Sequence, residues 1–319
     1  METRQLGTNG PHLTTLGFGA WAIGGPWKYG WGPVDDNESV KAIHAALDHG
    51  INWIDTAAAY GFGHSEEVVA KAIGDRPGRV FVATKCGLVS DGKGDAVRDS
   101  RPESIRKEIE GSLRRLRVEC IDLYQIHWHD DKIPVEESWG TLVKLREEGK
   151  VRSIGVSNYD VPLIERCMNV APVQSLQPPY SMLYREAERK TLPFCKDHGI
   201  GVVAYSPMQS GLLTGRFDVS KLAPDDWRRG SSMFQEPYLS RAMKFVDGLR
   251  PIAARYRKTV GQLAVAWFLS HPALTSAIVG ARTAAQVEEN IGAADWKPAT
   301  ADMRLIEELM RQHFPGEAA

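Results

Sequence analysis

Eight short apolar runs rich in Val and Ile recur along almost the whole chain, separated by helix-like segments. Six of the seven distances between the starts of successive runs are 22 to 41 residues, which suits a strand, a crossover helix and a parallel return. The repeat predicts one closed (β/α)8 TIM barrel, a single domain over residues 1–319. The expected strands are Leu16–Ala20, Ile51–Asp55, Val80–Lys85, Ile121–His127, Val151–Ser157, Val173–Gln177, Gly201–Tyr205 and Ala277–Gly280.

Segments outside these strands indicate additions to the barrel. Asn9-Gly10 between alternating residues predicts an N-terminal β-hairpin, which we expect to plug the barrel floor. The long seventh interval predicts two helices, Leu239–Tyr256 and Thr259–Leu269, after a loop over Pro207–Pro237. A long insertion at a strand end is usually functional. A further helix, Ala301–His313, is expected beyond the eighth strand.

Two helix starts carry capping signals. Asp36 is expected to cap a helix whose apolar face includes Val40 and Ile43. Ser100 with Glu103 has the spacing of a capping box before the next apolar helix. Both signals support crossover helices between the strands.

Composition and charge exclude several classes of protein. Lys and Arg number 39 against 40 Asp and Glu, so the formal net charge is −1 and the basic excess of a nucleic-acid binder is lacking. The longest apolar run, Leu263–Leu269, is far shorter than the ~20 residues that span a membrane. Met1–Gly10 is polar, unlike a secretory signal, and four scattered cysteines indicate no disulfide framework. We therefore expect a cytoplasmic protein without nucleic-acid or membrane partners.

Titratable side chains end three successive strands. Asp55, Lys85 and His127 close the second, third and fourth runs, and Tyr60 follows in a Gly-rich loop. Each residue alone has a structural explanation, as a cap, a surface amine, a core imidazole or loop packing. Together they predict a site, because the carboxyl ends of barrel strands meet at one mouth and an unpartnered buried charge is costly.

The chain resembles the aldo-keto reductases from its opening hairpin to its final helix. The resemblance implies a catalytic tetrad of Asp55, Tyr60, Lys85 and His127, and a nicotinamide cofactor bound without a Rossmann domain. The segments that carry it are Ile54-Asp55-Thr56-Ala57, Ala59-Tyr60-Gly61, Ala83-Thr84-Lys85, Asp122-Leu123-Tyr124-Gln125-Ile126-His127-Trp128, Gly155-Val156-Ser157-Asn158 and Tyr205-Ser206-Pro207.

Carbonyl reduction accounts for these residue types. Hydride delivered to a carbonyl carbon leaves charge growing on oxygen, which a nearby acid must neutralise. A free phenol has a pKa of about 10, and a neighbouring ammonium lowers such a pKa by roughly 1 to 3. Tyr60 is therefore the expected acid, Lys85 the group that lowers its pKa and Asp55 the partner of Lys85. His127 is expected to orient the carbonyl oxygen.

The resemblance also implies the cofactor residues. Ser157, Asn158 and Gln177 are expected to hold the carboxamide of the nicotinamide, and Tyr205 to stack beneath the ring. The expected contacts of the pyrophosphate and the adenosine end are Ser206, Met208, Gly211, Leu212, Arg216, Gly280, Arg282, Gln286, Glu289 and Asn290. Arg282 before a helix N-terminus suits an adenosine 2′-phosphate, so we expect NADP(H) rather than NAD(H).

The loops after the first and fourth strands are rich in aromatic residues expected to bind substrate. They are Trp21, Trp27, Trp31 and Trp128, whose flat faces suit a sugar ring or a polycyclic carbonyl compound. No Lys or Arg cluster lies among them, which favours neutral substrates. Only six residues follow His313, so we expect an open pocket. His129 is expected to be structural or solvent-facing, and Cys86 to pack.

Two alternatives stay open. A different barrel enzyme would use Lys85 for a Schiff base, or Asp55 and His127 for a metal, but it leaves Tyr60 without a role. A nicotinamide-binding sensor or regulatory partner subunit with slow turnover would retain the same four residues. The sequence itself indicates no metal site and no oligomeric state.

Overall fold

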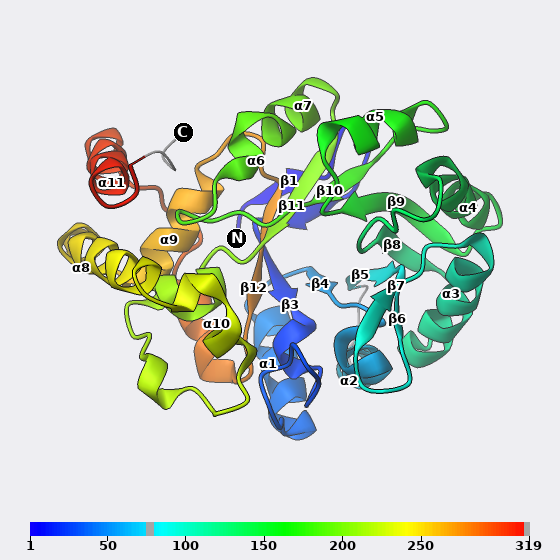
Figure 1. Cartoon of the computed structure of the whole chain (residues 1–319), viewed down its shortest axis with the longest axis horizontal. Helices are drawn as coiled ribbons and strands as arrows, with labels where there is room; N and C mark the ends of the chain where they lie inside the picture. The colour runs from blue at the N-terminus through cyan, green and yellow to red at the C-terminus, as the bar shows by residue number, and fades with distance from the viewer. Residues whose placement is uncertain (75–79, 316–319) are drawn as a thin grey trace.

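All eight apolar runs form strands of one closed parallel barrel in the computed structural model, which describes residues 1–74 and 80–315 (Figure 1). Their order around the barrel is β10-β11-β12-β3-β4-β5-β8-β9, so strands that follow one another in the repeat are also neighbours in space. The predicted (β/α)8 barrel is confirmed. The strands are β3 (Leu16–Gly19), β4 (Trp53–Asp55), β5 (Phe81–Cys86), β8 (Ile121–Ile126), β9 (Val151–Ser157), β10 (Ser175–Gln177), β11 (Gly201–Tyr205) and β12 (Ser276–Gly280).

The N-terminal hairpin closes one end of the barrel. It consists of β1 (Thr3–Gln5) and β2 (His12–Thr14), which pair antiparallel as the Asn-Gly turn predicts. Leu6 and Leu13 from this hairpin form a buried cluster with Trp53, Leu123 and other barrel side chains. The indole of Trp53 lies against β3, where a Cβ on Gly17 would come within 2.1 Å of the ring. The hairpin therefore continues the apolar interior of the barrel.

Helices surround the barrel as an outer layer (Figure 1). The predicted final helix, α11, lies beside α8 outside the barrel, where the rings of Tyr238 and Phe314 are 5.2 Å apart. The residues 316–319 beyond it lie outside the described part of the chain. The helices are α1 (Asp36–Asp48), α2 (His64–Gly74), α3 (Pro102–Leu116), α4 (Val135–Glu147), α5 (Val161–Met168), α6 (Glu186–Arg189), α7 (Thr191–Asp197), α8 (Tyr238–Arg255), α9 (Val260–Leu269), α10 (Ala284–Ile291) and α11 (Thr300–His313).

Both predicted helix caps differ from the structure. The side chain that caps α1 belongs to Asp35, one residue before the predicted Asp36. The capping box of Ser100 and Glu103 does not form, because α3 begins at Pro102 and has no side-chain cap. Proline has a φ suited to the first helical position and lacks an N–H that would be unpaired there, so it favours a helix start at Pro102.

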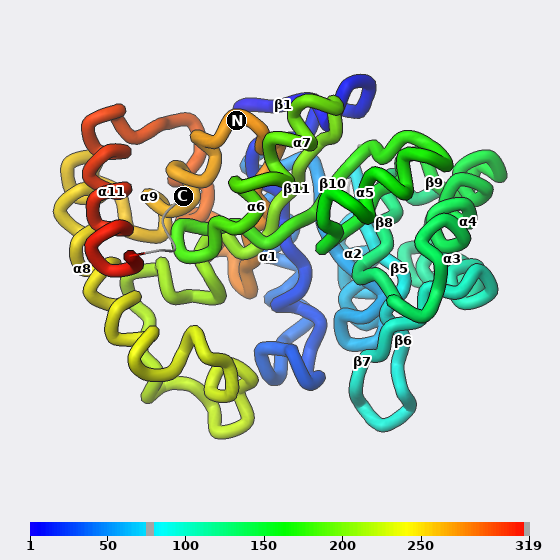
Figure 2. Tube along the Cα trace, turned by 45° about the horizontal axis from the view of Figure 1, so that its top comes forward, coloured from blue at the N-terminus to red at the C-terminus, as the bar shows by residue number. Residues whose placement is uncertain are grey.

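The loops at the carboxyl ends of the strands extend away from the N-terminal hairpin. Figure 2 shows this for the loop after β3, for the hairpin of β6 (Leu88–Ser90) and β7 (Ala96–Arg98), and for the long segment before α8. That segment contains the short 3-10 turns η3 (Gln209–Thr214), η4 (Val219–Lys221), η5 (Trp227–Gly230) and η6 (Ser232–Phe234). The inserted loops therefore lie where the strand-end side chains emerge.

Two further expectations concern the cysteines and the membrane. The four cysteines are free, and Cys86 packs in the core, where burial raises the pKa of its thiol well above the ordinary value. Among the described residues, no helix is both long and apolar enough to cross a bilayer.

A half-buried glutamate with a shielded carboxyl group supports the end of β5 from outside the barrel. Glu108 in α3 accepts a hydrogen bond from the backbone N–H of Gly87 at 3.0 Å, directly after the strand. Burial raises the pKa of this carboxyl to about 8. Glu108 therefore carries a proton in the folded protein near neutral pH, whereas an exposed glutamate does not.

This raised pKa predicts a loss of stability toward alkaline pH. The contribution of Glu108 is complete below about pH 4.3, the value of an exposed glutamate, and is lost as the pH rises to about 8. We expect the unfolding free energy of the parent to fall by about 1.4 kcal/mol per pH unit relative to Glu108→Gln, which retains the oxygen acceptor. Urea unfolding at pH 5.5, 6.5 and 7.5 measures this difference. The prediction would be contradicted if the free energy of unfolding changed with pH by the same amount in the two proteins.

Candidate active site

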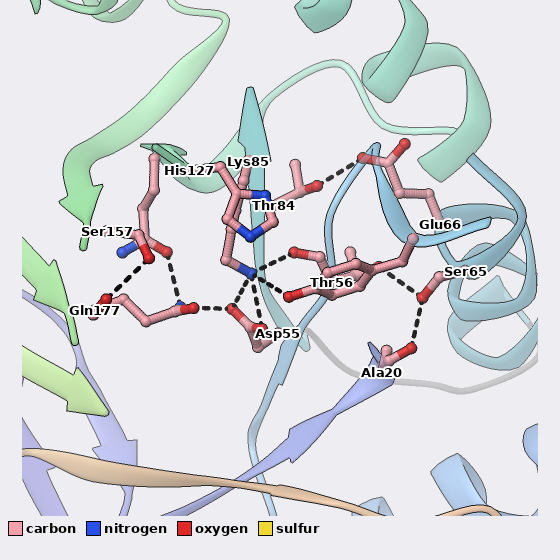
Figure 3. Close-up of polar contacts among 12 residues, drawn as sticks. Ala20, Asp55, Thr56, Ser65, Glu66, Thr84, Lys85, His127, Ser157 and Gln177 are labelled. Atoms are coloured by element: carbon pink, nitrogen blue, oxygen red, sulfur yellow. Dashed lines mark hydrogen bonds and ion pairs between the residues drawn. The ribbon is translucent and has the colours of Figure 1, made fainter. Parts of the chain in front are cut away.

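The ammonium of Lys85 is the centre of the strand-end cluster (Figure 3). Its Nζ donates to both carboxylate oxygens of Asp55, at 2.8 and 2.9 Å, and to the carbonyl oxygen of Thr56 at 2.9 Å. It also lies 3.3 Å from the phenolic oxygen of Tyr60. Lys85 is 1% exposed and Asp55 3% exposed. A charge pair this deeply buried requires good geometry and further hydrogen bonds, and the carbonyl and phenol supply them.

Tyr60 reaches this cluster because its loop turns sharply. Gly61 and Phe62, directly after it, have φ values of 61° and 53°. A Cβ at Gly61 would lie only 1.8 Å from the carbonyl oxygen of Gly24, so glycine is required there. The turn brings the ring of Tyr60 to 5.8 Å from the imidazole of His127. Four side chains from three successive strands and one loop are thereby assembled, as the sequence predicts.

Burial is the main influence on the pKa values of Tyr60 and His127. It raises the pKa of Tyr60 well above the usual value of 10, and the negative charge of Asp55 acts in the same direction. The expected net lowering of the Tyr60 pKa is therefore wrong for the chain alone, because burial and the charge of Asp55 raise it. Burial also lowers the pKa of His127 well below 6.5, and the charge of Lys85 lowers it further. The phenol is protonated and the imidazole neutral near pH 7.

A layer of amides supports the charged pair. Gln177 donates to Asp55 Oδ1 at 2.8 Å and to the side-chain oxygen of Gln125 at 3.1 Å. Ser157 donates its hydroxyl hydrogen to the carbonyl oxygen of Gln177, and these contacts are visible in Figure 3. The carboxylate is thus held directly by Gln177 at the end of β10, whose backbone carbonyl accepts from Ser157 at the end of β9.

A second chain of contacts involves Asn158. Its side-chain amide donates to the carbonyl oxygen of His127 at 3.0 Å and accepts from the hydroxyl of Tyr205 at 2.8 Å. Asn158 has a φ of 61°, an uncommon value for a residue with a side chain. The backbone carrying His127 is therefore tied to the ends of β9 and β11.

These groups face a cavity of about 860 Å³ at the carboxyl ends of the strands. Its size falls in the range of small-molecule and cofactor sites. The residues of the predicted site that line it are Asp55, Tyr60, His127, Asn158, Gln177, Tyr205, Ser206, Met208, Gly211, Arg216, Gly280, Arg282, Gln286, Glu289, Asn290, Trp21, Trp27, Trp31 and Trp128. Lys85, Ser157 and Leu212 are buried behind this lining.

The loop after β11 approaches the cavity with strained backbone. Ser206, Gln209 and Ser210 have φ values of 61°, 47° and 50°, and Gly211 has a φ of 103°. Left-handed conformations cost free energy in residues with side chains and persist where the surroundings impose them, often at ligand sites. The strain is concentrated in the segment predicted to cover a pyrophosphate.

Two arginines lie at the end of the cavity near α10. Arg216 pairs with Glu289 at 2.6 Å, and Arg282 donates to the carbonyl oxygens of Trp31 and Pro33 at 3.2 and 2.7 Å. Arg282 directly precedes the positive N-terminal end of α10, whereas Arg216 is held by Glu289 in the last turn of that helix. The donor set fits a dinucleotide, with two cations at this end of the cavity and proton donors at the other.

The aromatic wall is larger than the sequence predicts. The ring of Trp21 lies 6.1 Å from Trp31 and 5.9 Å from Trp227, and Trp227 also lines the cavity. The guanidinium of Arg228 lies 4.3 Å from the ring centre of Trp31. Trp227 and Arg228 were missed because they come from the long loop before α8. The feature of the sequence that points to these two residues is the length of that loop.

The neighbouring His129 does not line the cavity. Its ring lies 5.9 Å from that of Tyr159, and burial lowers its pKa below the ordinary value. This placement agrees with the structural role that the sequence favours.

Comparison with known proteins identifies the family of this barrel. Residues 15–311 match the model of the aldo/keto reductase family. The chain is 38% identical to the aldo-keto reductase YhdN of Bacillus subtilis (strain 168), over 97% of this chain and 94% of that protein. It is 36% identical to the NADH-specific methylglyoxal reductase of Escherichia coli (strain K12), over 97% and 98% of the two chains.

A solved structure agrees with this assignment. The glycerol dehydrogenase AKR11B4 from Gluconobacter oxydans superposes with a TM-score of 0.90 at 40% identity, over 98% of this chain and 96% of that chain. The fold and its strand-end site thus place the protein in a class of nicotinamide-dependent oxidoreductases that act on carbonyl compounds. The chain belongs to the aldo/keto reductase family.

The buried pair predicts an asymmetry between single and double substitutions. Asp55→Asn leaves the ammonium of Lys85 buried without its counter-charge, so we expect the free energy of unfolding to fall by about 3 to 5 kcal/mol. The double variant Asp55→Asn with Lys85→Met removes both charges and should recover most of this loss. Urea unfolding at pH 7 gives both values. A single variant as stable as the parent would contradict the prediction.

Proposed function

We propose that this protein reduces aldehydes or ketones to alcohols, reversibly, with NADP(H). A bound nicotinamide dinucleotide supplies the hydride that reaches the carbonyl carbon, and Tyr60 supplies the proton to the carbonyl oxygen. The observation that carries the proposal is the 3.3 Å contact between Lys85 Nζ and the phenolic oxygen of Tyr60 on a ligand-sized cavity. The substrate is a small carbonyl or alcohol molecule, and the proposed location is the cytoplasm.

The protonation states support Tyr60 as the general acid. Its raised pKa keeps the proton on the phenol until a carbonyl oxygen gains charge. As the proton leaves, the ammonium of Lys85 is positioned to stabilise the phenolate, and Asp55 holds that ammonium in place. In alcohol oxidation the same phenolate serves as the base.

The protonation state of His127 suits a role in orienting the substrate. Its pKa is well below 6.5, so its ring is neutral and carries one N–H donor near pH 7. A neutral imidazole donates a hydrogen bond to the carbonyl oxygen without competing with Tyr60 for the proton transfer. Trp21, Trp27, Trp31 and Trp128 are proposed to form the apolar walls around the rest of the substrate.

The preference for NADP(H) is supported by the cationic end of the cavity. Arg282 precedes α10, whose N-terminal backbone N–H groups attract anions, and Arg216 lies across from it in the lining. Glu289 holds Arg216 in an ion pair, so a phosphate must compete with a carboxylate for that guanidinium. The name of the Escherichia coli relative specifies NADH, which makes this preference the sharpest point to test.

Removing the phenolic hydroxyl tests the reaction itself. We expect Tyr60→Phe to lower kcat for aldehyde reduction by about 10²- to 10⁴-fold, because the general acid is lost, with nicotinamide binding retained. Absorbance at 340 nm follows turnover, and quenching of tryptophan fluorescence follows binding. Tyr159→Phe is the matched control, since Tyr159 is a buried tyrosine outside the cavity lining. Slow turnover that Tyr60→Phe leaves unchanged would instead favour a nicotinamide-binding sensor or regulatory subunit.

Substitution of Arg282 tests the cofactor preference. The parent should have a lower KM for NADPH than for NADH. Arg282→Gln should raise the KM for NADPH by about tenfold, because a charge-assisted contact to phosphate is lost. NADH serves as the internal control, since it lacks the 2′-phosphate, and its KM should change by less than about twofold. A parent enzyme that prefers NADH would refute the proposed preference.

A further inference from the structure

The hairpin of β6 and β7 brings one arginine to the cavity from the side opposite the loop after β11. This hairpin directly follows β5, and β5 stands four positions from β11 in the closed order of eight strands. Leu88, Ala96 and Arg98 of the hairpin line the cavity. Figure 2 shows the hairpin extending beyond the barrel on the side of the strand-end loops. Arg98 therefore lies across the cavity from the segment proposed to cover the cofactor.

The guanidinium of Arg98 is held in place by the loop that follows β8. It lies 5.1 Å from the ring centre of Trp128, and its Nη1 donates to the carbonyl oxygen of His129 at 3.2 Å. Both partners come directly after His127, the residue proposed to orient the carbonyl. A guanidinium stacked on an indole and anchored by a carbonyl loses little freedom when it binds a ligand.

The other charged groups of the lining are already engaged. Asp55 is paired with Lys85, Arg216 with Glu289, and Arg282 with backbone carbonyls. The acidic neighbour of Arg98 is Asp131, whose carboxylate is 3.9 Å from Nη1 and whose side chain is 86% exposed. A pair this long and this solvated contributes little. The side chain of Arg98 is itself 47% exposed, so its guanidinium is accessible to a ligand.

We propose that Arg98 binds a carboxylate of the substrate, so that the preferred substrates are carbonyl compounds that carry an acid group. The inference rests on the proposed reductase function and identifies its substrate class. The planar guanidinium matches a carboxylate through two parallel hydrogen bonds, while Leu88 and Trp128 pack against the carbon chain between the acid and carbonyl groups. Neutral substrates, which the sequence favours, would leave this cation without a ligand.

Acids and their esters test this recognition. The probes are 4-carboxybenzaldehyde and 4-oxobutanoate, each compared with its neutral methyl ester in the reduction assay. We expect Arg98→Gln to lower the ratio of kcat/KM for acid to that for ester by about tenfold in at least one pair, mainly through KM. The value for the ester itself should stay within about twofold of the parent.

Two variants serve as controls. Arg101→Gln removes the same charge from a neighbouring guanidinium that pairs with Asp99 and does not line the cavity, and it should leave the ratio unchanged. Asp131→Asn removes the distant, solvated carboxylate near Arg98 and should leave the ratio within about twofold of the parent. An equal fall of the ratio in Arg98→Gln and Arg101→Gln would mean a general effect of charge and would overturn the proposal.

The outcomes separate this inference from the proposed function. Esters reduced with acid-to-ester ratios that Arg98→Gln does not change would overturn acid recognition and leave the reductase function intact. If no acid or ester is reduced with either NADPH or NADH, the reductase function fails and the inference fails with it.

Discussion

The ion pair between Lys85 and Asp55 is the interaction on which the site depends. Both side chains are almost fully buried, so each requires the other and the amide and carbonyl groups around them. Because β4 and β5 are adjacent and parallel, barrel closure places the two charges within hydrogen-bonding distance at the mouth. The loop that carries Tyr60 then has a fixed cation to approach.

Burial of the pair also determines how the site holds protons. Burial, with the negative charge of Asp55 acting in the same direction, raises the pKa of Tyr60, so the phenol retains its proton. The same desolvation keeps His127 neutral. A protonated acid beside a neutral hydrogen-bond donor suits reduction of a carbonyl group, and the ammonium 3.3 Å from the phenolic oxygen partly offsets the cost of forming a buried phenolate.

Three arginines of the cavity illustrate how position decides the role of a charge. Arg282 and Arg216 lie near α10 and are held by carbonyls and by Glu289. Arg98 lies across the cavity, stacked on Trp128. Arginine is therefore proposed to serve two purposes, binding the cofactor phosphate on one side and the substrate acid on the other. Arg98 follows β5, whereas Arg216 and Arg282 follow β11 and β12, four and three positions away in the order of eight strands.

The sequence by itself predicted the barrel and the positions of Asp55, Lys85 and His127 at successive strand ends, because strand spacing and strand-end position are local patterns. The proposed roles of these residues and of Tyr60 came from the resemblance. It misplaced the cap of α1 and the start of α3, where neighbouring residues compete for the same role. Only the tertiary structure decided the direction of the pKa shift of Tyr60 and the places of Trp227 and Arg98. Burial and contacts between distant loops control these properties, and neither leaves a pattern of spacing along the chain.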